Sequence, residues 1–304
     1  MEKYGINIKT ENGKCARRRI GQSLTLILAA AAILASLAAG CGSGGKPEAD
    51  GDKGSAHLIQ ASQIGSAFGV SDEAGGRLIT FAGPNVSSAY EKLDIAIGKG
   101  GIVHAIEFAG WQEPDGNDSG RATSANFEHM GGYVYNVSDD TLKPDTTYYI
   151  ADSNALAESL IQAEDTGNLP LDGQELSVLT EAKGRIAQEG WVLGDLGGEG
   201  KVIAAVFEPQ GSQLLMSIVL NKGDSFKFMD YPAELKDGGA WRVDDGGVFA
   251  PEMLSVLFGL RTEDGMVIAV SWAGAEGEVT YFLIETDAGL EELPASAYRY
   301  WSPA

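Results

Sequence analysis

The sequence predicts an α+β protein built mainly from antiparallel hairpins, with two or three helices, after a signal peptide and a flexible tether. Three observations support this fold class. Apolar and polar residues alternate in short runs, which is the period of half-buried strands. The connections between many runs are too short for the crossover helices that parallel strands need. The chain has 41 glycines among its 304 residues, as expected for a turn-rich β protein.

The first part of the folded region predicts a short helix, a strand and two hairpins. The helix covers residues 58–68 and the strand covers 78–81. Each hairpin consists of two alternating runs on either side of a turn that contains glycine or proline. The predicted hairpins pair 93–97 with 102–108, and 133–135 with 146–150.

The remaining chain predicts two helices followed by strands. Asp152 or Ser153 caps a helix whose apolar positions run from Leu156 to Ala163. Apolar residues recur at helical spacing from 176 to 187, and Gly190 is the expected stop. We expect a final strand near residue 298 and seven earlier ones joined by short polar turns, at 191–196, 202–207, 214–220, 226–229, 254–260, 266–272 and 279–284.

A loop at 166–173 divides the folded region into two predicted halves. The first half, residues 57–165, mixes helix and hairpins. The second half, residues 174–304, is a helix followed by antiparallel strands. A chain of this length has room for about two domains.

The N-terminal segment has the composition of an export signal. Lysines and three consecutive arginines precede an uncharged apolar run from Leu24 to Gly40, which is the order of a secretory signal peptide. The sequence Leu-Ala-Ala-Gly-Cys at residues 37–41 resembles the lipobox of bacterial lipoproteins. An uncleaved membrane anchor is the alternative, although 17 apolar residues are marginal for a span of roughly 20.

The resemblance to lipoproteins implies cleavage before Cys41, whose thiol then carries a diacylglycerol lipid. Residues 1–40 would be the signal peptide. Residues 41–56 would be the acylated cysteine and a flexible linker, because they hold almost no apolar side chains to bury. The implied location is the outer face of the cell membrane, with the lipid anchor as the only membrane contact.

Removal of the signal changes the charge and the cysteine count. The whole chain carries a formal charge of −21, and the part from residue 41 keeps 16 basic and 41 acidic residues, a net charge of −25. This acidity excludes nucleic acid as a partner, since phosphate binding needs clustered lysine and arginine. Cys15 leaves with the signal and Cys41 is acylated, so no thiol remains for catalysis, a disulfide or a metal.

One acidic loop resembles the first half of a calcium-binding loop. Asp115, Asn117 and Ser119 place oxygen side chains at alternate positions before a glycine. The twelfth position is Asn126, where such loops use a bidentate glutamate, and the same residue types are common in ordinary loops. His129 nearby is a candidate general base or ligand. Calcium is the only cofactor that the sequence suggests.

Two tryptophans next to acidic turns form the candidate ligand site. Trp241 precedes Asp244 and Asp245, and Trp272 precedes Glu276. If the two turns meet, the indole rings could stack on a sugar and the carboxylates could accept its hydroxyl groups; paired carboxylates also run glycoside hydrolysis. The alternative is that each tryptophan anchors a hairpin end. No catalytic residue is assigned.

The stretch from Leu214 to Pro303 contains the sequences Trp241-Arg-Val-Asp-Asp-Gly-Gly and Gly274-Ala-Glu-Gly-Glu. It is similar to uncharacterised secreted or lipid-anchored proteins of Gram-positive bacteria. The resemblance implies no activity. The sequence therefore favours a non-enzymatic envelope lipoprotein with a binding or accessory role, whose partner is a cell-wall component or an envelope protein. The alternatives are the solute-binding subunit of a transporter, which needs a parallel core, and an envelope hydrolase that uses carboxylates.

Overall fold

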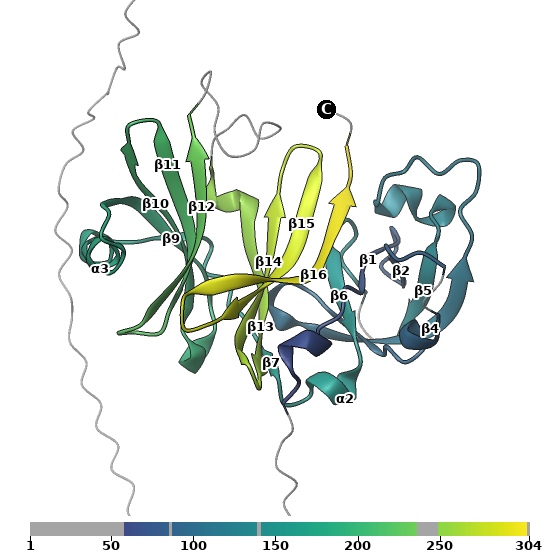
Figure 1. Cartoon of the computed structure of the whole chain (residues 1–304). Coiled ribbons are helices and arrows are strands. Elements are labelled where there is room, and N and C mark those ends of the chain that lie inside the picture. The colour runs from purple at the N-terminus through teal and green to yellow at the C-terminus, as the bar shows by residue number, and fades with distance from the viewer. Residues whose placement is uncertain (1–57, 85–86, 139–140, 236–248, 303–304) are drawn as a thin grey trace, which may run out of the picture. The chain divides into compact units, whose positions relative to one another are not determined.

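A computed structural model describes residues 58–84, 87–138, 141–235 and 249–302, which belong to one compact unit. Every strand pair within these ranges is antiparallel. The predicted α+β class with mainly antiparallel sheets is confirmed. The strands form a closed barrel and two five-stranded sheets (Figure 1).

The first six strands close into the barrel in the order β1-β2-β5-β4-β3-β6. Its interior is apolar and aromatic, and Tyr133, Tyr135 and Ile150 are almost completely buried there. The strands are β1 (Phe68–Ser71), β2 (Arg77–Thr80), β3 (Ile95–Ile97), β4 (Val103–Gln112), β5 (Gly132–Val137) and β6 (Thr147–Ala151). Between them lie α1 (Ser87–Tyr90) and the 3-10 turns η2 (Lys99–Gly101) and η3 (Ser124–His129), and η1 (Ala61–Gln63) precedes them.

One of the two hairpins predicted in this region is confirmed and the other is wrong. Strands β3 and β4 pair directly, with Ile97 opposite Val103. Strands β5 and β6 do not pair with each other, because β5 lies between β2 and β4 while β6 lies between β1 and β3. Barrel closure supplies partners that are distant in sequence and that local alternation cannot reveal.

The second part of the chain forms two stacked sheets. One sheet has the order β12-β11-β10-β9-β8 and the other β16-β15-β14-β13-β7. We call the second one the central sheet. The strands are β7 (Leu160–Ile161), β8 (Leu169–Pro170), β9 (Ala187–Asp195), β10 (Lys201–Gln210), β11 (Gln213–Asn221), β12 (Phe226–Glu234), β13 (Leu254–Thr262), β14 (Gly265–Ala273), β15 (Gly277–Glu285) and β16 (Leu290–Tyr300). The helical segments are α2 (Ser153–Leu156), α3 (Gly173–Lys183), η4 (Gly197–Glu199) and η6 (Pro251–Met253).

The predicted helices are shorter than the apolar spacing suggested. Asp152 does cap α2, but the helix ends after one turn and Leu160–Ile161 form β7 against β13. Helix α3 ends at Gly184 rather than Gly190, because Gly184 adopts φ +69° and its N–H closes the last turn onto Thr180. The first predicted helix is only the turn η1, and Phe68 already begins β1.

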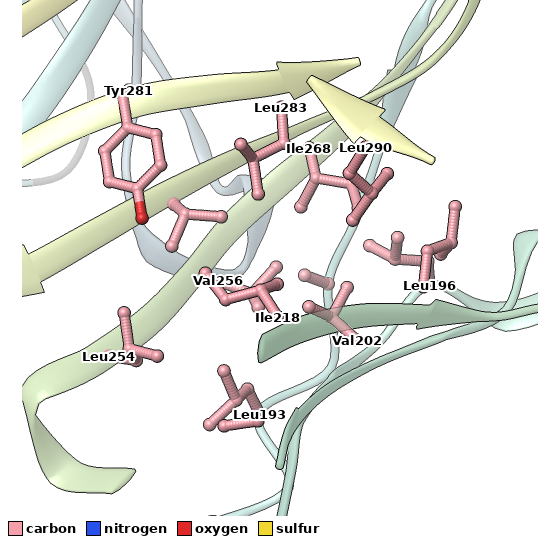
Figure 2. Packing of buried hydrophobic residues seen from close by; sticks show 14 of the residues in the cluster. Leu193, Leu196, Val202, Ile218, Leu254, Val256, Ile268, Tyr281, Leu283 and Leu290 are labelled. Carbon is pink, nitrogen blue, oxygen red and sulfur yellow. The ribbon is translucent and has the colours of Figure 1, made fainter. Parts of the chain in front are cut away.

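The central sheet buries both of its faces. On one face Ile268, Val270 and Leu283 pack against the β8–β12 sheet. Figure 2 shows Ile268 and Leu283 meeting Val202 and Ile218 from the opposite side. The other face packs against the barrel, where Phe258 and Phe282 contact Phe68 and Tyr149. Adjacent residues on β14 point in opposite directions, so one strand contributes to both interfaces.

Candidate functional site

The residues predicted to bind a sugar lie partly outside the described structure. Trp241, Asp244 and Asp245 fall in the undescribed range 236–248. Trp272 is only 7% exposed, and its ring packs edge-on against Tyr231 at 5.1 Å between centroids. Glu276 lies in the turn between β14 and β15. The structure thus places Trp272 in the core, and the binding role of these five residues stays a prediction. Cys41 also lies outside the described residues.

The predicted calcium loop is held together by its own hydrogen bonds. One carboxylate oxygen of Asp115 accepts from the backbone N–H of Asn117 at 2.7 Å, and the other lies 2.9 Å from Nδ1 of His129. The hydrogen bond to His129 is the main reason that the pKa of Asp115 is lowered. The side-chain oxygen of Asn126 accepts from the N–H of Ser119. The two candidates Asp115 and His129 therefore form a pair.

No three His, Cys, Asp or Glu side chains gather into a metal-binding group among the residues that the structure describes. Glu128, the carboxylate nearest to the twelfth position of the loop, forms an ion pair with Arg77. Calcium binding by Asp115, Asn117 and Ser119 stays a prediction that needs a direct test.

A cleft of the described structure lies between α3 and the outer face of the β8–β12 sheet. This outer face is turned away from the central sheet (Figure 1). Helix α3 begins where Asp172 accepts hydrogen bonds from the N–H groups of Gln174 and Glu175. Its second half rests on the sheet, because Leu179 is buried and Lys183 pairs with Asp230 at 2.6 Å. The cleft opens beside the first half of the helix, where Val178 is 43% exposed.

The floor of this cleft, which we call the α3 cleft, comes from two rows of side chains across the sheet. In the inner row Val192 and Ile203 are directly opposite each other and both are buried. In the outer row Lys201 lies opposite Asp195 on β9 and Asn221 on β11. Residues opposite each other in neighbouring strands project from the same face, so the floor changes from apolar to polar toward the open end.

The α3 cleft combines an apolar floor with a mainly acidic rim. Its volume is about 460 Å³, which is within the range of small-ligand sites. The carboxylates of Asp172, Glu175 and Asp195 line it together with one cation, Lys201. A ligand that buries an apolar group and presents positive charge to the rim matches this arrangement.

Sequence reasoning missed the α3 cleft, although one signal was present. The run from Val202 to Phe207 is apolar at nearly every position, whereas a strand with one face in water alternates. Such a run indicates that both faces of β10 are covered. The sequence does not show which segment covers the outer face or that α3 leaves part of it open.

Comparison of the chain with protein-family models, curated proteins and solved structures found no match. Within the described ranges, no helix is both long enough and apolar enough to cross a membrane.

Proposed function

We propose that the chain is a bacterial lipoprotein, anchored through Cys41 at the outer face of the cell membrane, that binds a basic peptide segment of another envelope protein without catalysis. The observation that carries the binding role is the α3 cleft, with its apolar floor of Val192 and Ile203 and its acidic rim. Charge complementarity selects the occupant, since three carboxylates face one lysine there. An apolar side chain of the peptide fills the cleft and its basic neighbours face the rim.

The proposed cellular location is inferred from the N-terminal sequence. Basic residues, an uncharged apolar run and the sequence at 37–41 have the order found in lipoprotein signals. Residues 42–56 contain five glycines and almost no apolar side chains, which suits a spacer between lipid and folded region. A basic partner also fits the net charge of −25 that remains after cleavage.

Binding is favoured over catalysis because the carboxylates of the α3 cleft already have structural tasks. Asp172 caps α3, and Asp195 accepts a hydrogen bond from the N–H of Gly197. The hydrolase alternative depends on Asp244 and Asp245, which the structure does not describe. The solute-binding alternative depends on a parallel core, and the described strand pairs are antiparallel.

Replacing Cys41 by serine tests the anchor. Serine has no thiol, so we expect Cys41→Ser to abolish labelling by a fatty-acid analogue and to release the protein from the membrane fraction. Cys15→Ser is the matched control, because Cys15 lies within the segment expected to be removed. Equal labelling and membrane retention of Cys41→Ser and the wild type would contradict the anchor.

Thermal shift of the full chain in neutral detergent tests the α3 cleft. The probe is the tripeptide acetyl-Lys-Phe-Lys-amide, which should raise the melting temperature by binding the native state. Lys201→Glu removes a positive charge from the rim and should increase the shift, while Gln174→Lys should decrease it. Each change is worth about 0.2–1 kcal/mol of binding free energy at an exposed position.

Lys143→Glu on the barrel is the control for these variants, since it makes the same charge change as Lys201→Glu on an exposed residue outside the cleft. The shift caused by the tripeptide should be the same in Lys143→Glu and in the wild type. Parallel changes in Lys143→Glu and Lys201→Glu would show that the tripeptide responds only to net charge and would overturn the assignment of the cleft.

A further inference from the structure

A second polar site lies where the barrel meets the central sheet. Most of this interface is apolar, but one end carries an ion pair between Glu278 on β15 and Arg299 on β16. Arg299 is 5% exposed. Burying two charges is costly unless their hydrogen-bonding groups are satisfied, so each donor and acceptor of the pair has to be accounted for.

Both carboxylate oxygens of Glu278 accept hydrogen bonds. One carboxylate oxygen accepts from Nε of Arg299 at 3.0 Å and from the hydroxyl of Thr147 on β6 of the barrel. The other oxygen accepts from the hydroxyl of Ser271 at 2.9 Å. This carboxylate balances the charge of Arg299 and connects the barrel to the central sheet.

The donors of Arg299 are not fully engaged. Its Nε donates to Glu278, and its guanidinium carbon lies 4.6 Å from the centre of the Trp301 ring, which covers one face. Within the described part of the chain, the two terminal Nη groups donate to no protein acceptor. A buried guanidinium with four such N–H bonds needs acceptors from water or from a ligand.

Arg299 lines a cavity of about 140 Å³, which we call the junction cavity. Glu278, Thr147 and Ser271 form its inner wall, and Lys99 and Asp145 contribute from the barrel side. Asp145 is exposed and accepts two hydrogen bonds from Ser124, and no cation of the described residues pairs with it.

The charges of the junction cavity select the kind of ligand. Lys99 is already paired with Asp165 at 2.7 Å, which lowers the pKa of Asp165. Arg299 is balanced by Glu278, so its Nη groups offer directed donors without excess positive charge. Asp145 is the carboxylate left without a counter-charge. A simple anion would be repelled by Asp145, whereas a neutral amide would leave it unpaired.

We propose that the junction cavity binds a free α-amino acid with a small side chain. The ligand carboxylate accepts from the two Nη groups of Arg299, a bidentate geometry that guanidinium groups favour. The ligand ammonium group donates to Asp145. This site shares no residue with the α3 cleft, so the inference does not depend on the peptide-binding proposal.

Isothermal titration of the full chain in neutral detergent tests this inference with glycine and L-alanine. We expect saturable binding of at least one of them, and no binding of acetate or acetamide, which each carry half of the recognised groups. Acetate that binds as tightly as glycine would overturn the zwitterion assignment. Absence of heat with every probe up to about 10 mM would show that the cavity holds only water.

Two variants test whether the amino acid binds in the junction cavity. Arg299→Lys keeps the charge but loses the paired donors, and should raise the dissociation constant at least tenfold. Ser255→Met fills the cavity from β13 and leaves Arg299 itself unsubstituted, and should abolish binding even if Arg299→Lys fails to fold. Ser212→Met in the exposed β10–β11 turn is the matched control and should bind like the wild type. Unchanged affinity in folded Ser255→Met would overturn the location.

Discussion

The two faces of the central sheet pack against different partners in chemically different ways. The face toward the β8–β12 sheet is mainly apolar, with Ile268 and Val270 fully buried, and the hydroxyl groups of Tyr231 and Tyr281 hydrogen-bond there at 2.8 Å. The face toward the barrel begins with Phe258 and Phe282 but ends in the ion pair of Glu278 and Arg299. One face of the central sheet therefore packs through apolar area and neutral hydroxyl groups, whereas the other also contains a buried ion pair.

The difference indicates what each interface contributes. Apolar burial stabilises in proportion to area, about 25 cal/mol per Å². Replacing a buried ion pair by apolar residues of similar volume is often neutral or even stabilising. Stability alone thus gives little reason for Glu278 and Arg299. We infer that the polar end serves ligand binding, and the following predictions test that contrast.

The largest effect is expected from breaking the ion pair on one side only. Glu278→Leu leaves Arg299 buried without its counter-charge, and should reduce the free energy of unfolding by about 3–5 kcal/mol. The double variant Glu278→Leu with Arg299→Leu should recover most of this loss and should not bind amino acids. Chemical denaturation and isothermal titration measure both quantities. A double variant less stable than Glu278→Leu would show that the pair itself stabilises the interface.

A second prediction uses one tyrosine from each interface. Burial raises the pKa of Tyr149, at the barrel face, and of Tyr231, at the other face, to about 12. Because these values lie above the ordinary value of 10.0, the stability linked to them is complete below pH 10 and is lost as the pH rises toward 12. Absorbance at the tyrosinate band should show these two groups titrating late, together with unfolding. Ionisation of all tyrosines near pH 10 in the folded protein would contradict this burial.

A smaller effect is expected on the apolar face. Ile268→Val removes one buried methylene group and should cost about 0.5–1.5 kcal/mol. Amino-acid binding at the junction cavity should not change, because Ile268 points to the opposite face of the sheet. Denaturation and titration of the same sample provide the comparison. Lost binding in a folded Ile268→Val variant would mean that the two faces are coupled.

The smallest effect concerns the exposed loop of Asp115, outside both interfaces. The calcium hypothesis predicts that millimolar calcium raises the melting temperature of the full chain. Asp115→Asn should remove this rise. Asp118→Asn tests whether the loss of another loop carboxylate has the same effect, since the Asp118 side chain accepts hydrogen bonds from the N–H of Gly120 and the side-chain amide of Asn126. An unchanged melting temperature with calcium would contradict the calcium hypothesis and leave Asp115 with its hydrogen bonds to Asn117 and His129.

The sequence predicted local pairing better than distant pairing. Strands such as β10 and β11 follow each other across a tight turn, so two apolar runs separated by a short turn with glycine were sufficient to find them. The runs of β5 and β6 look like a hairpin, yet their partners lie elsewhere in the barrel. The α3 cleft depends on how a helix rests on a sheet, and the junction cavity combines residues 99, 147 and 299, which no local pattern connects.

The most direct test of the proposed function is isothermal titration of the full chain with two tripeptides of opposite charge. We expect acetyl-Lys-Phe-Lys-amide to bind at one site, with an affinity that falls as salt screens the acidic rim. Acetyl-Glu-Phe-Glu-amide should not bind. Equal binding of both tripeptides, or binding of neither, would contradict the account of the α3 cleft as a site for basic peptides.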